Sequence, residues 1–228
     1  MSVKAAHAKT CKWLRQKSEY LHWLDPQKLP DHLGFLWMRE SPEPARTLMK
    51  YALANSRKHT KDRTVISFFF NARGVDLEKS TVGMYRSLLL QLLERLPELQ
   101  CVFESLGFAC WNSSNDHTWS IESLKDLFQQ TIQSLGQNAV TCFIDALDEC
   151  DVDQIRDMVA SFQHLGALVV PAQIRFQVFF SSRHYPHITV SQGLRLVPKD
   201  RRGTSRIFGH LQLIKKASSK PHLIFHSS

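Results

Sequence analysis

The sequence contains no apolar run approaching the roughly 20 residues that a membrane-spanning helix needs. The first residues, from Met1 to His7, also lack the apolar core of a secretory signal peptide. The five cysteines are odd in number, scattered and without CxxC spacing, which disfavours a disulfide framework and a metal centre. We therefore expect a cytoplasmic protein with reduced cysteines and no membrane association.

Hydrolase signatures are absent as well. The sequence has no GxSxG nucleophile elbow, and no cysteine lies in a recognisable nucleophile motif. The content of 43% hydrophobic and 22% charged residues is that of a folded globular protein, and 228 residues can bury the core of one α/β domain. A serine or cysteine hydrolase is thereby set aside.

The net charge of +8 is concentrated at one end of the chain. From Arg195 onward there are eight Lys/Arg residues and one acidic residue, Asp200, which leaves 21 basic and 20 acidic residues in the rest. The body of the protein is therefore electrically balanced. The basic tail could attract nucleic acid only through non-specific phosphate contacts.

Hydrophobic periodicity predicts an alternation of strands and helices. The predicted strands are 35–38, 64–70, 139–145 and 175–181, and the predicted helices are 5–25, 48–56, 80–96, 120–135 and 153–165. This order indicates an α/β protein whose helices cover a mainly parallel sheet. We expect a helical segment at 1–33, a core at 34–193 and a basic tail at 194–228 that is poorly ordered.

The third of these strands ends in an acidic cluster, Phe143-Ile144-Asp145-Ala146-Leu147-Asp148-Glu149. Open α/β sheets bind ligands at the carboxyl ends of their strands. In nucleotide-hydrolysing folds a carboxylate holds Mg²⁺ and another group orients the attacking water. A strand that simply runs into an acidic turn is the competing interpretation, so a phosphate-binding loop has to be sought upstream.

Six segments in order resemble the NACHT domain of fungal signal-transduction NTPases, of the nephrocystin-like N-terminal type. They are AHAKTCKWL, GFLW, SFFFNARG, DLEKSTVGMYRSLLLQLL, CFIDALDEC and FSSRHYPHI, and they cover roughly residues 5–193. The resemblance implies a P-loop NTPase core of the STAND class, forming a three-layer αβα sandwich, as in NLR-like switch proteins. It also implies Mg²⁺ with ATP or GTP as cofactor, and effector proteins or self-association as partners.

The resemblance further implies roles for individual residues. Asp145 matches the Mg²⁺-associated carboxylate, and Asp148 and Glu149 match the catalytic acidic pair, of which Glu149 would orient water. Arg183, in the segment Ser181-Ser182-Arg183, matches an arginine that detects the terminal phosphate.

The phosphate-binding loop that the family shows, GKPGTGKST, is altered here. The spacing GxxxxGK[ST] survives with Glu40, Ala45, Arg46 and Thr47 at the defining positions, but no glycine remains. Such a loop binds phosphate through backbone N–H groups that glycine conformations aim at the ligand. Pro44 has no N–H, and each nearby carboxylate would repel a phosphate by about 4 kcal/mol in a surface-like dielectric. These residues are at most a vestigial nucleotide site.

The altered loop has a regularity at the codon level. If each codon from Arg39 to Arg46 is read so that its third letter joins the next codon's first two, the seven new codons can spell Gly-Lys-Pro-Gly-Thr-Gly-Lys. The same shift over residues 198–208 can also give a family-like continuation. We therefore hypothesise that both segments are translated out of an ancestral frame, against divergent evolution of the loop as the alternative.

We expect a truncated NACHT-like module that is defective in nucleotide binding, is not an active NTPase and acts through protein–protein interaction. Two alternatives stay open. One is a working switch that binds Mg-ATP or Mg-GTP. The other is a protein that binds nucleic acid non-specifically through its basic tail.

Overall fold

The computed structural model describes residues 12–39, 42–59, 62–102, 119–183 and 193–196. For residues 12, 39, 42–47 and 59 it describes the backbone alone. The basic tail beyond residue 197, with the nucleic-acid alternative that depends on it, lies outside these ranges. The chain divides into a unit of residues 1–198 and a second unit of residues 199–228.

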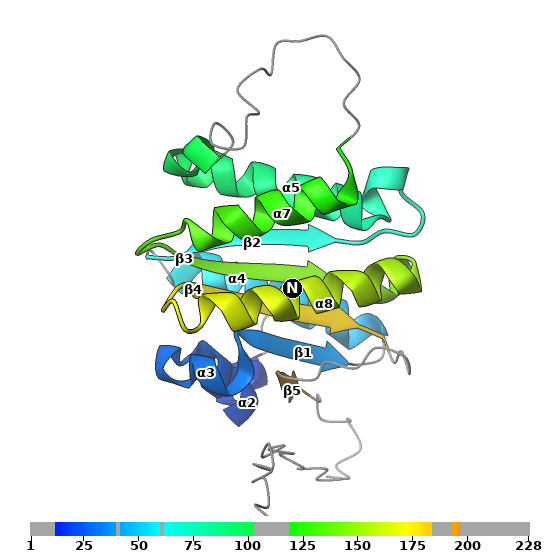
Figure 1. Cartoon of the computed structure of the whole chain (residues 1–228). Helices are drawn as coiled ribbons and strands as arrows, with labels where there is room; N and C mark the ends of the chain where they lie inside the picture. The colour runs from blue at the N-terminus through cyan, green and yellow to red at the C-terminus, as the bar shows by residue number, and fades with distance from the viewer. Residues whose placement is uncertain (1–11, 40–41, 60–61, 103–118, 184–192, 197–228) are drawn as a thin grey trace, which may run out of the picture. The chain divides into compact units, whose positions relative to one another are not determined.

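The described residues form a sheet of five strands, all parallel, in the order β2-β3-β4-β1-β5 (Figure 1). The strands are β1 (Phe35–Arg39), β2 (Thr64–Phe69), β3 (Ala139–Asp145), β4 (Arg175–Ser182) and β5 (Leu194–Leu196). The predicted α/β class and parallel sheet are confirmed. The strand β5 pairs with β1 and takes three residues from the segment that the sequence assigned to the tail.

Helices cover both faces of the sheet, because each strand turns alternate side chains to opposite sides. One face packs α5 (Thr81–Arg95), α7 (Ile121–Gln133) and α8 (Val152–Val169) against Phe35, Trp37, Phe176, Val178 and Phe180. The other packs α2 (Ser18–Leu24) and α4 (Pro42–His59) against Leu36, Met38, Phe143 and Phe179. Figure 1 shows α7 and α8 in front of the sheet and α4 behind it.

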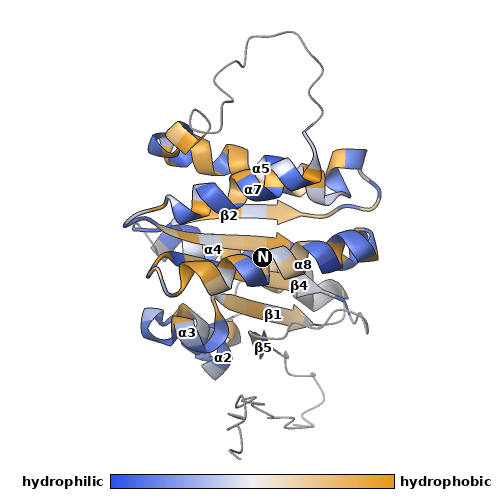
Figure 2. Cartoon of the chain, viewed as in Figure 1, coloured by the Kyte–Doolittle hydropathy of each residue, from blue (hydrophilic) through white to orange (hydrophobic). Residues whose placement is uncertain are grey.

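Burial explains why the strand predictions hold. Every residue of β3 is buried, and all of β4 except Arg175 is buried as well. Such strands read as continuous apolar runs. Figure 2 shows the inner strands as mainly hydrophobic, whereas α7 and α8 alternate between hydrophobic and hydrophilic residues, as helices with one solvent-facing side do.

Helix ends follow their capping residues. The hydroxyl of Ser80 accepts from the N–H of Gly83 at the start of α5, and the hydroxyl of Ser120 accepts from the N–H of Ser123 at the start of α7. These are the caps expected of serine in the position before a helix. The short 3₁₀ turns Asp76–Glu78 and Pro97–Gln100 lie at the two ends of α5.

From residue 12 the N-terminal segment forms short elements where the sequence predicted one continuous helix over 5–25, and residues 5–11 of that helix lie outside the described residues. They are a 3₁₀ turn (Lys12–Gln16), α2, a second 3₁₀ turn (Pro26–Lys28) and α3 (Leu29–His32). Lys17 is extended between the first two elements, with φ −76° and ψ 128°. The break lets both Leu14 and Trp23 reach the core, since both are fully buried.

Gly34 joins this segment to the sheet. Its carbonyl accepts from the indole Nε1–H of Trp23 (2.8 Å) and from the N–H of Val178 (2.8 Å), and its own N–H donates to Nδ1 of His32 (3.1 Å). Its φ is +83°, and a Cβ there would lie 2.5 Å from the carbonyl oxygen of Phe176. Only glycine fits this position without displacement of the backbone.

We predict that His32 makes the protein acid-sensitive. Its side chain is fully buried, and burial, with a smaller contribution from nearby His22, lowers the pKa of His32 to about 4. In the unfolded chain the pKa is about 6.5, so the folded state binds fewer protons between these values. Stability from His32 is therefore present above pH 6.5 and is lost as the pH falls toward 4, by about 3 kcal/mol.

The measurement is the free energy of urea unfolding of the parent and of His32→Asn between pH 7 and pH 4. Asparagine keeps an acceptor for the N–H of Gly34 and does not titrate. We expect a shallower loss for the variant. Equal pH dependence in the two proteins would contradict the assignment.

Candidate functional site

The carboxyl ends of all five strands meet at one edge of the sheet because the strands are parallel. The helices that leave this edge pack on opposite faces of the sheet. The helix α4 leaves β1 toward one face, and α8 leaves β3 toward the other. In open α/β sheets such a switch in direction opens a crevice that binds ligands. The candidate site is therefore the edge at which β1, β3 and β4 end.

Asp145 is the last residue of β3 and is only 2% exposed. Ile144 pairs with Phe180, so Asp145 and Ser181 are neighbours in the next row of the sheet. Ser181 is 1% exposed and pairs with Met38 of β1. The alternation of the strand places this row on the face covered by α4, where Phe143 also lies. A carboxylate and a hydroxyl are oxygen ligands of the kind Mg²⁺ prefers.

The chain leaves β3 through a tight turn. Ala146 has φ 58° and ψ 45°, a left-handed conformation that costs a non-glycine residue about 1 kcal/mol or more. A single 3₁₀ turn, Leu147–Glu149, follows, closed by the N–H of Glu149 donating to the carbonyl of Ala146 (2.9 Å). This turn directs the side chains of Asp148 and Glu149 to two different neighbours.

Asp148 binds the end of β4. One of its carboxylate oxygens accepts from the backbone N–H of Arg183 (2.8 Å), and the other accepts from Nε of the same residue. The Asp148 side chain is 5% exposed, and that of Arg183 is 53% exposed. The arginine and the carboxylate that the resemblance assigned to phosphate detection and catalysis are thus paired with each other. Asp148 fixes the position of Arg183.

Glu149 binds the loop after β2. Its Oε2 accepts from the backbone N–H of Ala72 (3.0 Å). That loop is organised by Asn71 and Glu78: the N–H of Asn71 donates to the carbonyl of Glu78 (3.0 Å), and the Glu78 carboxylate accepts from the N–H of Val75 (3.2 Å). The acidic turn therefore connects the ends of β2, β3 and β4.

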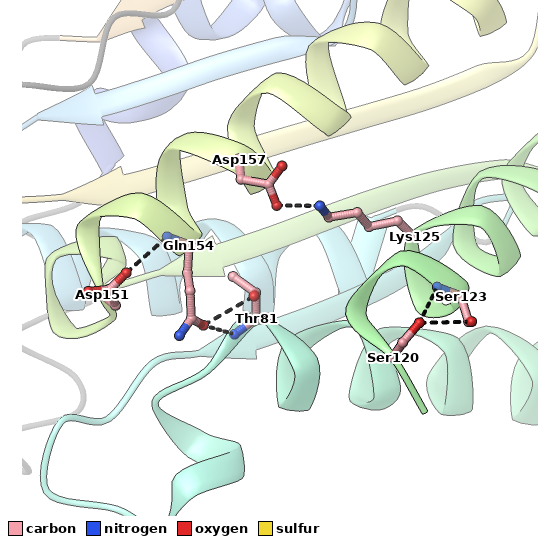
Figure 3. A network of polar contacts seen from close by, with 7 residues as sticks. All are labelled: Thr81, Ser120, Ser123, Lys125, Asp151, Gln154 and Asp157. Atoms are coloured by element: carbon pink, nitrogen blue, oxygen red, sulfur yellow. Dashed lines mark hydrogen bonds and ion pairs between the residues drawn. The ribbon is translucent and has the colours of Figure 1, made fainter. Parts of the chain in front are cut away.

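The helix that follows the acidic turn is anchored to its neighbours (Figure 3). Asp151 caps α8 by accepting from the N–H groups of Asp153 and Gln154, both at 3.0 Å. The side-chain oxygen of Gln154 accepts from the N–H (3.1 Å) and the hydroxyl (3.2 Å) of Thr81 in α5. A Lys125–Asp157 ion pair joins α7 to α8. These contacts hold the acidic turn from its C-terminal side.

The segment that should form the phosphate-binding loop is the start of α4. The helix begins at Pro42, six residues earlier than the predicted helix at 48–56, so Ala45, Arg46 and Thr47 lie within its first two turns. Glu40 lies outside the described residues. Of the first four helical positions, Pro42 and Pro44 have no N–H. Proline is compatible with a first helical turn because those N–H groups have no partner inside the helix.

Of the three cysteines that are described, Cys142 and Cys150 are buried packing residues and Cys101 is exposed. Burial raises the pKa of the Cys150 thiol to about 11 and raises that of Cys142 further above its usual range. A thiol that stays protonated is a poor nucleophile and a poor metal ligand. Within the described ranges, no group of three or more His, Cys, Asp or Glu side chains could hold a metal ion.

Two further findings concern other surfaces of the described part of the chain. No helix there has both the length and the apolar character that a bilayer crossing requires. A hollow of about 370 Å³ lies between α5, α7 and α8, lined by Tyr85, Lys125 and Phe162 among others. None of the candidate site residues lines it.

The structure thus brings Asp145, Asp148, Glu149 and Arg183 to one edge, with the start of α4 following β1 at that edge. Sequence reasoning missed the Ala72 amide and the pairing of Asp148 with Arg183. Both contacts join residues more than 30 positions apart, and no local pattern signals them.

The parallel sheet, the acidic end of β3 and the arginine after β4 are those of a NACHT-like domain of the P-loop NTPase class. A family model described as "Nephrocystin 3, N-terminal" matches residues 9–183, and the chain belongs to this family.

A relative in Podospora anserina, "Vegetative incompatibility protein HET-E-1", is 23% identical over 195 residues. The match covers 81% of this chain and 13% of that protein. A similarity to the structure of C. elegans PCH-2 has 8% identity and a TM-score of 0.34, covering 86% of this chain and 41% of that one. At that TM-score the likeness carries no argument.

We predict that Asp148→Ala destabilises the protein by about 1–3 kcal/mol, because it removes a carboxylate that is only 5% exposed and accepts two hydrogen bonds from Arg183. The matched control is Asp153→Ala, which removes an ion pair with Arg156 at the surface. The side chain of Asp153 is 87% exposed. That change should cost less than about 1 kcal/mol. Chemical denaturation measures both, and equal costs would show that the Asp148 contact has no special weight.

Proposed function

We propose that this chain is a NACHT-like signal-transduction module that does not bind nucleotide effectively and acts through protein–protein interaction. The observation that carries the proposal is the start of α4 at Pro42, in place of a glycine-rich loop. Mg²⁺ with ATP or GTP is the cofactor that the family implies, and the described residues fit such a group poorly.

The first reason for the poor fit is the supply of amide donors. A P-loop surrounds the phosphates with successive backbone N–H groups. Here the positions between Glu40 and Ala45 that are described are already helical, and Pro44, which stands where the family loop has threonine, contributes no N–H. A helix start still has a positive end of its dipole, but Glu43 occupies the second helical position. The negative charge of a glutamate at this position in the sequence opposes an anionic ligand at the same helix start.

The second reason is that the charged groups at the other strand ends already bind protein atoms. Both oxygens of Asp148 accept from Arg183, and an oxygen of Glu149 accepts from Ala72. A water-orienting or phosphate-detecting role would require these bonds to be exchanged. The carboxylates that remain therefore support the fold of this edge.

Protein interaction is supported by exposed apolar side chains near the site. Val75 is 68% exposed and Leu77 is 45% exposed, on the loop that Glu78 organises and Glu149 contacts through Ala72. An ordered loop loses little conformational entropy when it binds a partner. The name of the Podospora anserina relative, a vegetative incompatibility protein, also suits a role in recognition between proteins.

A working nucleotide switch is the second candidate, and one observation favours it. Asp145 and Ser181 are both buried at neighbouring strand ends on the α4 face, which is an arrangement of oxygen ligands suited to Mg²⁺. In that case Arg46 and Thr47 would contact the phosphates, and Arg183 would have to leave Asp148.

Restoring the family loop tests the proposal. The variant carries Glu40→Gly, Ser41→Lys, Glu43→Gly, Pro44→Thr, Ala45→Gly and Arg46→Lys, and it keeps Pro42 and Thr47. We expect it to gain binding of Mg-ATP or Mg-GTP by about a thousandfold, since about 4 kcal/mol of lost donors and added repulsion would be recovered. Isothermal titration calorimetry measures the gain against the parent chain.

The matched control adds Asp145→Ala to the restored loop. Binding that appears with the loop and disappears with this change assigns the defect to residues 40–46. If the restored loop binds no better than the parent, the loop is not what prevents binding, and the proposal is wrong on that point.

The shifted reading frame is the origin that we propose for this loop. This origin requires particular codons in the gene. The third letter of each codon, read together with the first two letters of the following codon, must encode the family residue. Sequencing the genomic and transcript DNA across residues 39–46 and 198–208 is expected to find such codons. Codons incompatible with that reading would leave divergent evolution as the explanation.

A further inference from the structure

The strand β2 is an edge strand, and one side of its backbone faces away from β3. Alternate residues of an edge strand present unpaired N–H and C=O groups, which can pair with a strand of another molecule. In β2 these residues include Val65 and Ser67. Figure 1 shows α5 alongside β2 at this edge.

The side-chain amide of Gln91 binds Ser67 as a neighbouring strand would. The N–H of Ser67 donates to Oε1 of Gln91 (3.0 Å), and Nε2 of Gln91 donates to the carbonyl of Ser67 (2.9 Å). The amide is held in place by its own helix, because Nε2 also donates to the carbonyl of Ser87 (3.1 Å). A primary amide has both a donor and an acceptor, so it satisfies both backbone groups at once.

One helical turn further along, Arg95 donates from Nη1 to the carbonyl of Val65. Gln91 and Arg95 are four residues apart and therefore lie on the same face of α5. A second arginine, Arg57 of α4, reaches the hydroxyl of Ser67 from the opposite face of the sheet (3.5 Å). The edge thus has three of its backbone groups occupied and two positive charges beside it.

We propose that Gln91 and Arg95 keep the edge of β2 closed to strand pairing with a second copy of this chain. The occupant that they exclude is another β2, because two identical edges can pair antiparallel about a twofold axis, which is the commonest symmetry of protein dimers. Such pairing would bring Arg57 and Arg95 of both copies together, and like charges across an interface disfavour the wrong partner. Capping by hydrogen bonds and repulsion by charge act in the same direction.

The test compares the full-length parent with the double variant Gln91→Ala/Arg95→Ala. The matched control is Arg86→Ala/Gln133→Ala, which removes one arginine and one glutamine from exposed positions of α5 and α7. Sedimentation velocity over a range of concentrations measures self-association. We expect the double variant alone to dimerise, with an affinity about tenfold to a thousandfold above that of the parent. This range follows if each of the three freed backbone groups gains the usual net free energy of one hydrogen bond in the dimer.

Two results would overturn the proposal. One is a folded double variant that stays as monomeric as the control, and the other is a control that associates as strongly as the double variant. If the double variant does not fold, the single variant Gln91→Ala is used instead, and native-state hydrogen exchange measures the exchange rate of its backbone amides. We expect the Ser67 amide to exchange about tenfold faster in that variant, and an unchanged Ser67 amide would contradict the role of Gln91.

Discussion

The parallel direction of the five strands determines where the functional groups of this chain lie. It brings the carboxyl ends of β1, β3 and β4 to one edge, so that an acidic turn, an arginine and a helix start converge there from distant parts of the sequence. The opposite placement of α4 and α8 makes this edge the switch point of the sheet. Any ligand of the family type would have to bind here.

At this edge two sets of residues differ in character. The end of β3 and the end of β4 carry the residues that the resemblance matched to the family site, and Asp148 and Arg183 bind each other there. The start of α4 keeps the spacing of the family motif without its chemistry, since Glu40, Glu43 and Ala45 replace the three glycines and Pro44 replaces a threonine. A domain can retain its fold under such a change, because Pro42 and Pro44 are acceptable in a first helical turn. Phosphate binding, which depends on the missing amides, is what we expect to be lost.

The sequence predicted β1 to β4 within about one residue at each end, because buried parallel strands appear as apolar runs bounded by polar residues. It did not predict the start of α4, because the resemblance assigned residues 40–47 to a phosphate-binding loop. The N-terminal helix was also predicted as continuous, although Lys17 is extended and divides it. Contacts such as Gln91 with Ser67 and Glu149 with Ala72 depend on the tertiary arrangement and have no local signal.

Direct titration of the unaltered chain with Mg-ATP and Mg-GTP is the measurement that bears most closely on this account. Heteronuclear NMR can follow the backbone amides at the ends of β1, β3 and β4 during the titration. The account predicts no saturable shift at nucleotide concentrations up to about 1 mM, a limit that corresponds to about 4 kcal/mol of binding free energy. A micromolar dissociation constant that is lost on Asp145→Ala would contradict it and would make the protein a working nucleotide switch.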